Sequence, residues 1–108
     1  MENPWSGVVQ IEIDGVKRPM SLTLGALAEL EVDLGEDTLV ALVERFESGG
    51  FSSSDVLGLI VAGLRGGGWE VERADLLAAE VSGGPMGAAK VAARLLARAF
   101  LLPEERRA

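Results

Sequence analysis

Thr23-Leu24-Gly25-Ala26-Leu27-Ala28-Glu29-Leu30-Glu31 is the stretch of sequence that decides the fold, because it carries the start and the apolar face of a helix. The Thr23 hydroxyl can accept a hydrogen bond from an N–H of the first turn, which makes this residue a good N-cap. Leu27, Leu30 and Leu34 lie at i, i+3 and i+7 and so share one face. Gly35 favours the left-handed conformation in which many helices end. The pattern predicts a helix over 24–34 that comes straight off a strand and closes its apolar face over a hairpin.

The residues before this helix predict that hairpin. Val9, Ile11 and Ile13 alternate with polar residues, which is the period of a strand. Asp14-Gly15 follows, and this pair favours a two-residue type I′ turn. The turn sets a register in which Ile13 faces Val16, Glu12 faces Lys17, Ile11 faces Arg18 and Val9 faces Met20. Pro19 cannot donate to a strand ladder, so the second strand is expected at an edge. An isolated hairpin is marginal in water, so it must pack on helices or be extended by another chain's strand.

Two further helices follow. The first has an apolar face at helical spacing and an outward face of charged residues: Leu39, Leu42, Val43 and Phe46 inward, and Glu44, Arg45 and Glu47 outward. Gly49-Gly50 ends it. Ser52 then marks the N-cap of the next helix, with Asp55 at the N3 position of a capping box. Phe51 is expected to pack on Val56 as a hydrophobic staple.

The helix that starts after Ser52 is apolar nearly all round between Val56 and Leu64, which is typical of a central helix. Gly58 and Gly63 in its interior each cost about 1 kcal/mol relative to Ala, so we expect a neighbouring backbone to approach closely there. Arg65-Gly66-Gly67-Gly68 predicts a flexible exit from this helix.

The remaining residues predict a short helix and a long one. A helix over about 73–81 should direct Leu77 and Val81 inward before Ser82-Gly83-Gly84 breaks it. Pro85 suits the first turn of the last helix. That helix has a broad apolar face made of Val91, Ala92, Leu95, Leu96, Ala99 and Phe100. Pro103 is expected to stop it.

These patterns predict an α+β fold that is mainly α. We expect a hairpin over about 7–22, about five helices over 24–101 and a charged tail over 103–108, all in one domain that spans residues 1–108. The Val56–Leu64 helix is expected at its centre.

Composition narrows the function. The chain contains no Cys, no His and no Tyr. That removes disulfides, Cys/His zinc sites, Cys nucleophiles and Ser-His-Asp triads. We therefore expect no enzyme, and we predict no catalytic, cofactor-binding or metal-binding residues.

The net charge of −7 is unevenly spread along the chain. Residues 1–55 hold 11 acidic and 3 basic side chains, whereas residues 56–108 hold 6 acidic and 7 basic ones. A free-standing nucleic-acid binder usually has the opposite overall sign, so no direct binding of nucleic acid is expected. The uneven charge suits a protein that orients against a protein partner, or it serves solubility alone.

No leader or membrane segment is apparent. The N-terminus opens Met-Glu-Asn-Pro-Trp, with neither a basic region nor an apolar run. The most apolar window, 56–64, is far shorter than the roughly 20 residues that span a bilayer. The sequence therefore predicts a cytoplasmic protein that does not bind membranes.

An acidic cluster gathers at the end of the first helix. It consists of Glu29, Asp33, Glu36 and Asp37. Carboxylate oxygens suit a hard metal ion, but no calcium-loop spacing is present. The alternative is a solvated face in which Asp37 complements the dipole of the following helix, and this alternative is the one we adopt.

Two features follow the central helix. Arg65-Gly66-Gly67-Gly68 suggests a phosphate cradle, but the Lys-Ser/Thr of a P-loop is missing and the run follows a helix rather than a strand. A helix C-cap with a connector is the alternative. Trp69 beside it is either an anchor for a partner or a satellite contact of the core.

Basic side chains on the last helix and a tryptophan near the N-terminus complete the candidates. Lys90, Arg94 and Arg98 lie at i, i+4 and i+8 and form either a surface for an acidic partner or a solvated outer face. Trp5 either packs beside the hairpin or lies at an oligomer contact. The residues predicted to bind a partner are Trp5, Arg65, Trp69, Lys90, Arg94 and Arg98.

Four stretches together resemble one small phage-derived family. They are Ser21-Leu22-Thr23-Leu24-Gly25-Ala26-Leu27-Ala28-Glu29-Leu30-Glu31, then Leu39–Phe46, then Asp55-Val56-Leu57 with Ala62-Gly63-Leu64-Arg65-Gly66-Gly67-Gly68, and finally Ala93-Arg94-Leu95-Leu96-Ala97-Arg98-Ala99-Phe100. The chain is similar over Asn3–Phe100 to the tail-assembly proteins of gene transfer agents and related long-tailed prophages. The first of these stretches is the most specific.

The resemblance implies one of two roles in a bacterial host cell. A tail assembly chaperone coats the helical tape-measure protein, keeps it soluble, recruits the tail tube protein and leaves before the particle is finished. A structural tail component stays in the particle. The mainly helical pattern favours the chaperone, because a tube subunit generally needs a sizeable β-sheet to form a ring. Self-association is expected because a tape measure needs many copies. An unrelated helical adaptor module is the remaining alternative.

Overall fold

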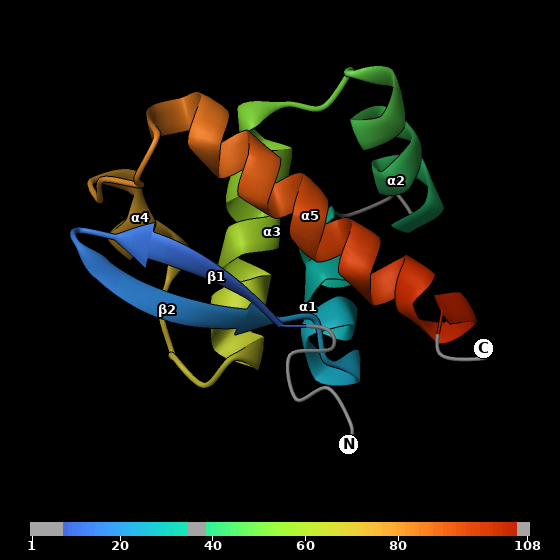
Figure 1. The fold of residues 1–108 in the computed structure, drawn as a ribbon, viewed down its shortest axis with the longest axis horizontal. Helices are drawn as coiled ribbons and strands as arrows, with labels where there is room; N and C mark the ends of the chain where they lie inside the picture. The colour runs from blue at the N-terminus through green and yellow to red at the C-terminus, as the bar shows by residue number, and fades with distance from the viewer. Residues whose placement is uncertain (1–7, 35–38, 106–108) are drawn as a thin grey trace.

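A central helix, α3 (Ser53–Gly66), organises the fold. The structure is a computed structural model that describes residues 8–34 and 39–105. The other elements are β1 (Val8–Ile13), β2 (Val16–Ser21), α1 (Leu24–Leu34), α2 (Leu39–Ser48), α4 (Arg73–Leu77) and α5 (Gly84–Glu105). Helix α3 contacts β2, α1, α4 and α5, and α5 crosses over it (Figure 1). The predicted fold class, α+β and mainly α with a central α3, is confirmed.

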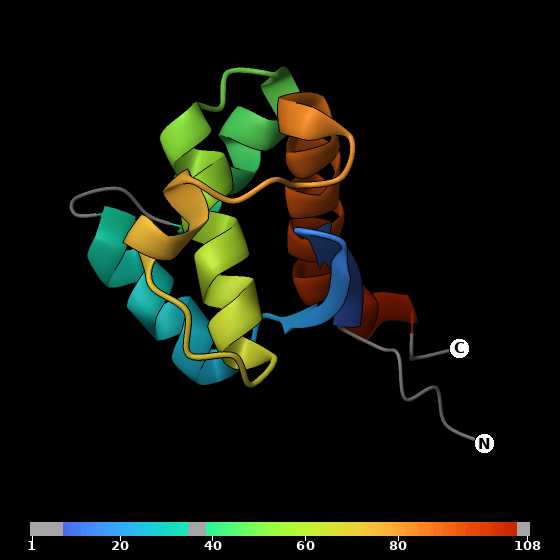
Figure 2. The same cartoon turned by 90° about the vertical axis from the view of Figure 1, so that its left-hand side faces the viewer.

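The elements lie on opposite sides of α3. Figure 2 shows α1 and α4 on one side and α5 with the hairpin on the other. Leu59 and Leu64 of α3 are completely buried between these two sides, together with Leu95 of α5. Such burial on both sides explains why the sequence of α3 lacks a polar face.

The hairpin has the predicted register. Ile13 pairs with Val16, Glu12 with Lys17, Ile11 with Arg18 and Val9 with Met20. Asp14 and Gly15 both have positive φ, 52° and 82°, as a type I′ turn requires. Val9, Ile11, Ile13 and Met20 are buried, so one face of the hairpin belongs to the core.

Helix α1 does not close over the hairpin, contrary to the prediction. Its main contacts are with α3, against which Ala26 and Leu30 are buried. The reason is that β2 packs on α3 and β1 packs on α5. These two helices cover the apolar face of the hairpin and leave no place there for α1. Thr23 caps α1 as predicted, since its Oγ1 accepts a hydrogen bond from the Ala26 N–H at 3.0 Å. Gly35 lies outside the described residues.

Gly67 is the C-cap of α3, which confirms the C-cap alternative for this glycine run, and Gly66 and Gly67 are closely packed. A Cβ on Gly66 would overlap the carbonyl oxygen of Ser21, and one on Gly67 would overlap that of Pro19. The close backbone approach expected at Gly58 and Gly63 is therefore found at Gly66 and Gly67 instead, one turn after Gly63. At Gly63 the neighbours are instead the side chains of Leu95 and Met20, and Gly58 has room for a methyl group.

Both outer edges of the hairpin have neighbours within the chain. Gly66 and Gly67 lie against β2. At the end of β1, the Ser82 N–H donates to the Glu12 carbonyl at 3.1 Å, and in the turn that follows the Asp14 N–H donates to the Glu80 carbonyl at 2.8 Å. The hairpin thus packs on helices, which was the first of the two predicted possibilities.

Helix α2 and its exit follow the prediction except at Arg45. Leu42 is completely buried, Glu44 and Glu47 are exposed, and Gly49 ends the helix with a φ of 85°. Arg45 is half-buried and does not point outward, because it pairs with Asp55. The Ser52–Asp55 capping box is present. Phe51 stacks on Phe46 with ring centroids 4.6 Å apart, a contact that the capping pattern does not predict.

The short helix differs from its prediction. Helix α4 ends at Leu77, whose side chain is 73% exposed instead of buried. Leu76 packs against the core in its place. Val81 is half-buried but not helical, because its backbone pairs with Ile13 in an isolated bridge. A residue paired with a strand has extended backbone, so the helix cannot reach position 81.

Helix α5 starts as predicted and ends later than predicted. Pro85 lies in its first turn, but the helix continues past Pro103 to Glu105. A proline forfeits one helical hydrogen bond and yet has a φ compatible with the helix. Part of the predicted tail, 103–105, is therefore helical, and 106–108 lie outside the described residues. In the described ranges, no helix combines the length and apolarity needed to cross a membrane.

Candidate functional site

An ion pair fixes α2 to the start of α3. Arg45 Nε donates to Asp55 Oδ2 at 2.8 Å, and Arg45 Nη2 donates to Asp55 Oδ1 at 2.9 Å. Asp55 is 9% exposed and also accepts from the Ser52 N–H. The Arg45 guanidinium holds the pKa of Asp55 below its usual value, and burial offsets only part of that shift. Asp55 lines neither of the hollows described next, so its perturbed pKa belongs to a structural joint.

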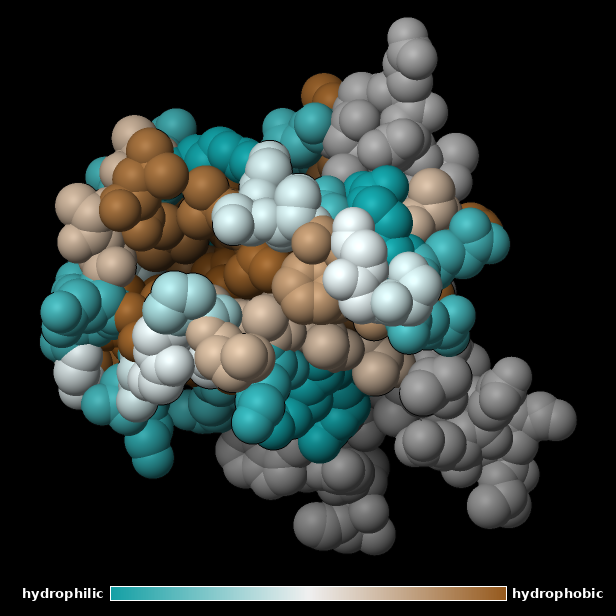
Figure 3. Space-filling view, turned by 90° about the horizontal axis from the view of Figure 1, so that it is seen from above, coloured by the Kyte–Doolittle hydropathy of each residue, from teal (hydrophilic) through white to brown (hydrophobic). Residues whose placement is uncertain are grey.

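One hollow is an apolar groove bounded by α3, α4 and α5. Its volume is about 610 Å³, and Figure 3 shows hydrophobic side chains along it. The groove is lined by Phe51, Ser53, Val56, Leu57, Ile60, Leu76, Leu77, Val81, Pro85, Met86, Ala88 and Ala89. Leu77 and Met86 stand at its mouth, 73% and 69% exposed.

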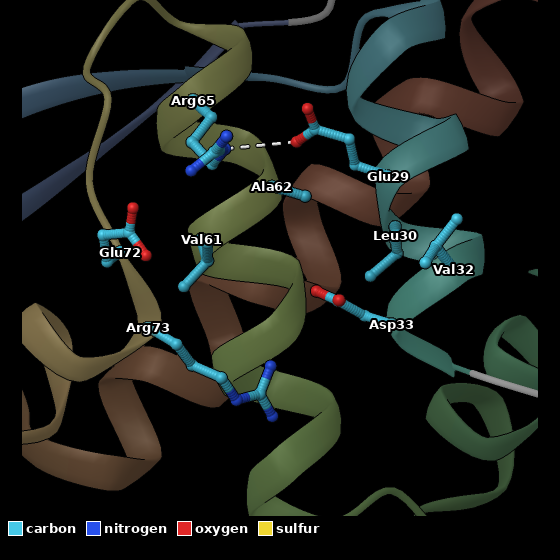
Figure 4. Close-up of a pocket in the computed structure, with 9 residues that line it drawn as sticks. All are labelled: Glu29, Leu30, Val32, Asp33, Val61, Ala62, Arg65, Glu72 and Arg73. Atoms are coloured by element: carbon cyan, nitrogen blue, oxygen red, sulfur yellow. Dashed lines mark hydrogen bonds and ion pairs between the residues drawn. The ribbon is translucent and has the colours of Figure 1, made fainter.

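A second hollow, the mixed-charge cleft, lies between α1, α3 and α4 (Figure 4). It has a volume of about 370 Å³ and is lined by Glu29, Leu30, Val32, Asp33, Val61, Ala62, Arg65, Glu72 and Arg73. Arg65 Nε donates to Glu29 Oε1 at 3.1 Å across the cleft, and Arg65 Nη1 donates to the Val71 carbonyl. Arg73 Nη2 donates to Ser54 Oγ at 2.8 Å. These cations are engaged by the protein itself.

The predicted acidic cluster contributes two members to this cleft. Asp33 points from α1 toward α3, and Glu29 points toward Arg65 (Figure 4). Glu36 and Asp37 lie outside the described residues. Among the described residues, no three metal-binding side chains come together.

Trp69 lies just after the end of α3. Trp69 is half-buried and packs against the core, and Arg18 lies over its ring with Cζ 4.0 Å from the ring centroid. The buried Nε of Arg18 has no hydrogen-bond partner in the part of the chain described. Trp69 is therefore a contact of the core on one side and a platform for a cation on the other.

The three basic residues of α5 do not share one environment. Lys90 and Arg94 are exposed. Arg98 is half-buried, and its Nη1 donates to the Val8 carbonyl of β1 at 3.4 Å. Trp5 lies outside the described residues. The structure thus distributes the five described residues of the predicted partner-binding set over the mixed-charge cleft, the hairpin side and the outer face of α5.

The groove is the feature that sequence reasoning missed. The sequence pattern predicts that Leu77 points inward, and it gives no signal for Met86. The residues next to Leu77 and Met86 in the sequence give no sign of a groove. The groove forms because α4 and the first turns of α5 lie beside the same end of α3.

The fold defines the chain as a small, mainly helical α+β protein. A family model described as "Phage tail tube protein, GTA-gp10" matches residues 6–101. The chain belongs to this family, and its role is related to phage tails. A comparison with curated proteins found no match. A comparison with solved structures found none either. The family match removes the alternative of an unrelated adaptor module.

Proposed function

We propose that the protein is a non-catalytic tail assembly chaperone that binds the tape-measure protein and helps the tail tube protein to assemble. Family membership supports a tail role. The observation that favours the chaperone is that the described residues contain a single two-stranded sheet beside five helices. A ring of tube subunits generally requires a larger sheet in each subunit. A helical surface instead suits a helical partner.

The proposal includes the place and the partners of this work. The protein acts in the cytoplasm of a bacterial host cell while a particle is assembled, without binding nucleic acid or membrane directly. The net charge of −7 supports this view, since it opposes binding to a polyanion.

The description of the family favours a second function, a structural tail component retained in the particle. Quantitative mass spectrometry of purified particles separates the two. A chaperone is absent or far below stoichiometric amounts, whereas a tube or tail component is present in amounts comparable to other tail proteins.

The direct test is co-expression with a tape-measure protein of a gene transfer agent or prophage that carries a member of this family. We expect the soluble fraction of the tape measure to rise several-fold, with a stable complex recovered by pull-down. An unchanged soluble fraction and no complex contradict the proposal.

Self-association is a further part of the proposal, because many copies are needed along one tape measure. Light scattering over a wide concentration range should give a mass above that of the 11.3 kDa chain. A mass that stays monomeric over the whole range contradicts this part.

A further inference from the structure

The apolar groove is open where a solvent-exposed surface is expected to be polar. Leu77 on α4 and Met86 on α5 flank it with most of their side chains exposed. Exposed apolar side chains that lie singly need no explanation, but a contiguous apolar surface around a hollow marks a binding site. Methionine at such a site adapts its shape to a partner.

The lining of the groove indicates which kind of partner fits. None of its twelve lining residues carries a charge, and Ser53 alone has a polar side chain. A site for a small polar molecule needs several convergent polar groups to orient it, and this one lacks them. The occupant must therefore present mainly apolar side chains.

The shape of the groove favours a helix. Three helices, α3, α4 and α5, supply most of its lining, and a further helix can pack on them by fitting its side-chain ridges into the grooves of their surfaces. An amphipathic helix inserts apolar residues at i, i+3, i+4 and i+7 into such a groove. Strand addition is disfavoured because both outer edges of the hairpin already have neighbours from this chain.

Basic side chains on α5 indicate which charge a bound helix should carry on the side that faces them. Lys90 lies one helical turn after Met86, and Arg94 one turn later, so both follow the groove along the exposed side of α5. Both are exposed, and α5 contains no acidic residue between Gly84 and Ala99. This stretch of α5 is therefore cationic on a chain whose net charge is −7. Carboxylates on the partner would complement it.

We propose that the apolar groove binds an amphipathic helix of a partner protein, with acidic side chains on the flank that faces Lys90 and Arg94. The inference rests on the proposed function, in which the tape-measure protein supplies that helix. It adds the site, the conformation of the bound segment and its charge.

Two designed peptides of about 18 residues, or five helical turns, test the groove without a tape measure. Both carry Leu at i, i+3, i+4 and i+7, and one has Glu and the other Lys on the flank. Fluorescence anisotropy should show the Glu peptide binding at least tenfold more tightly, with an advantage that shrinks at high salt. Equal binding of the two peptides, or binding of neither, overturns the proposal.

Variants of the chain locate the binding. Leu77→Gln and Met86→Gln should each weaken binding of the Glu peptide by about tenfold, and Lys90→Glu should have a similar effect. Leu24→Gln is the matched control, since Leu24 is 84% exposed and lies outside the groove. Lys17→Glu repeats the charge change on the hairpin. Neither control should alter binding, and equal loss in the controls contradicts the assignment of the groove.

The same variants in the co-expression experiment separate the two proposals. If the wild-type chain solubilises the tape measure and Leu77→Gln does so equally well, the groove is not the binding site and the proposed chaperone function is supported. If the wild-type chain has no effect but binds the Glu peptide through the groove, the function is wrong and the groove stands. If the peptides do not bind and Met86→Gln lowers the mass in light scattering, the groove is an interface between copies, which overturns the proposal.

Discussion

Replacing Gly66 with alanine is expected to destabilise the folded chain by about 3 kcal/mol, at the upper end of the cost of overpacking. The new Cβ would overlap the carbonyl oxygen of Ser21 and approach the Cβ of Ala26 to 3.3 Å. The oxygen belongs to the backbone of β2, so it cannot turn aside as a side chain could. The higher helix propensity of alanine returns at most about 1 kcal/mol, which the overlap outweighs.

Gly25→Ala is the matched control for this substitution. Gly25 lies inside α1, and a Cβ there would come no closer than 3.9 Å to Thr23 Oγ1. The same chemical change should therefore stabilise the protein by about 0.5–1 kcal/mol. Urea unfolding followed by circular dichroism measures both variants. A Gly66→Ala variant as stable as the wild type would show that β2 does not lie against the end of α3.

Features set by neighbouring residues could be predicted from the sequence. The hairpin register follows from Asp14-Gly15 and the alternation before it, and the capping box follows from Ser52 and Asp55 three residues apart. Each depends on a few adjacent positions whose backbone geometry is decided locally. These predictions are confirmed to the residue.

Features set by distant residues could not be predicted. The residues around Gly66 do not indicate that β2 lies against this glycine, and those around Val81 do not indicate that Val81 pairs with Ile13. The same holds for the basic residues of α5, where periodicity gives Arg98 and Lys90 similar positions. Only the packing of β1 along one side of α5 gives Arg98 a carbonyl partner. The groove is the hardest feature to predict from the sequence, because long-range packing alone brings its lining residues together.

Asp55→Asn is expected to destabilise the protein by about 2 kcal/mol at neutral pH, because a hydrogen bond to a charged group contributes about 1.5–3 kcal/mol to stability. The amide keeps the shape of the side chain but loses the charge that Arg45 meets at 2.8 Å. Glu47→Gln removes a carboxylate from the exposed face of α2 and should change the free energy of unfolding by less than about 0.5 kcal/mol.

The dependence on pH identifies the carboxylate as the cause. Because Arg45 lowers the pKa of Asp55 in the folded state from its ordinary 3.8, the folded state holds this proton more weakly than the unfolded state does. The stability that the ion pair contributes is therefore fully present above about pH 4 and is lost as the pH falls through the lowered pKa. The wild type should lose its advantage over Asp55→Asn across that acid range, whereas the difference at pH 6 to 8 stays constant to within about 0.5 kcal/mol. Urea unfolding at a series of pH values measures this difference. A gap between the two proteins that persists unchanged far below pH 4 would mean that Asp55 stabilises the joint between α2 and α3 by its shape and not by its charge.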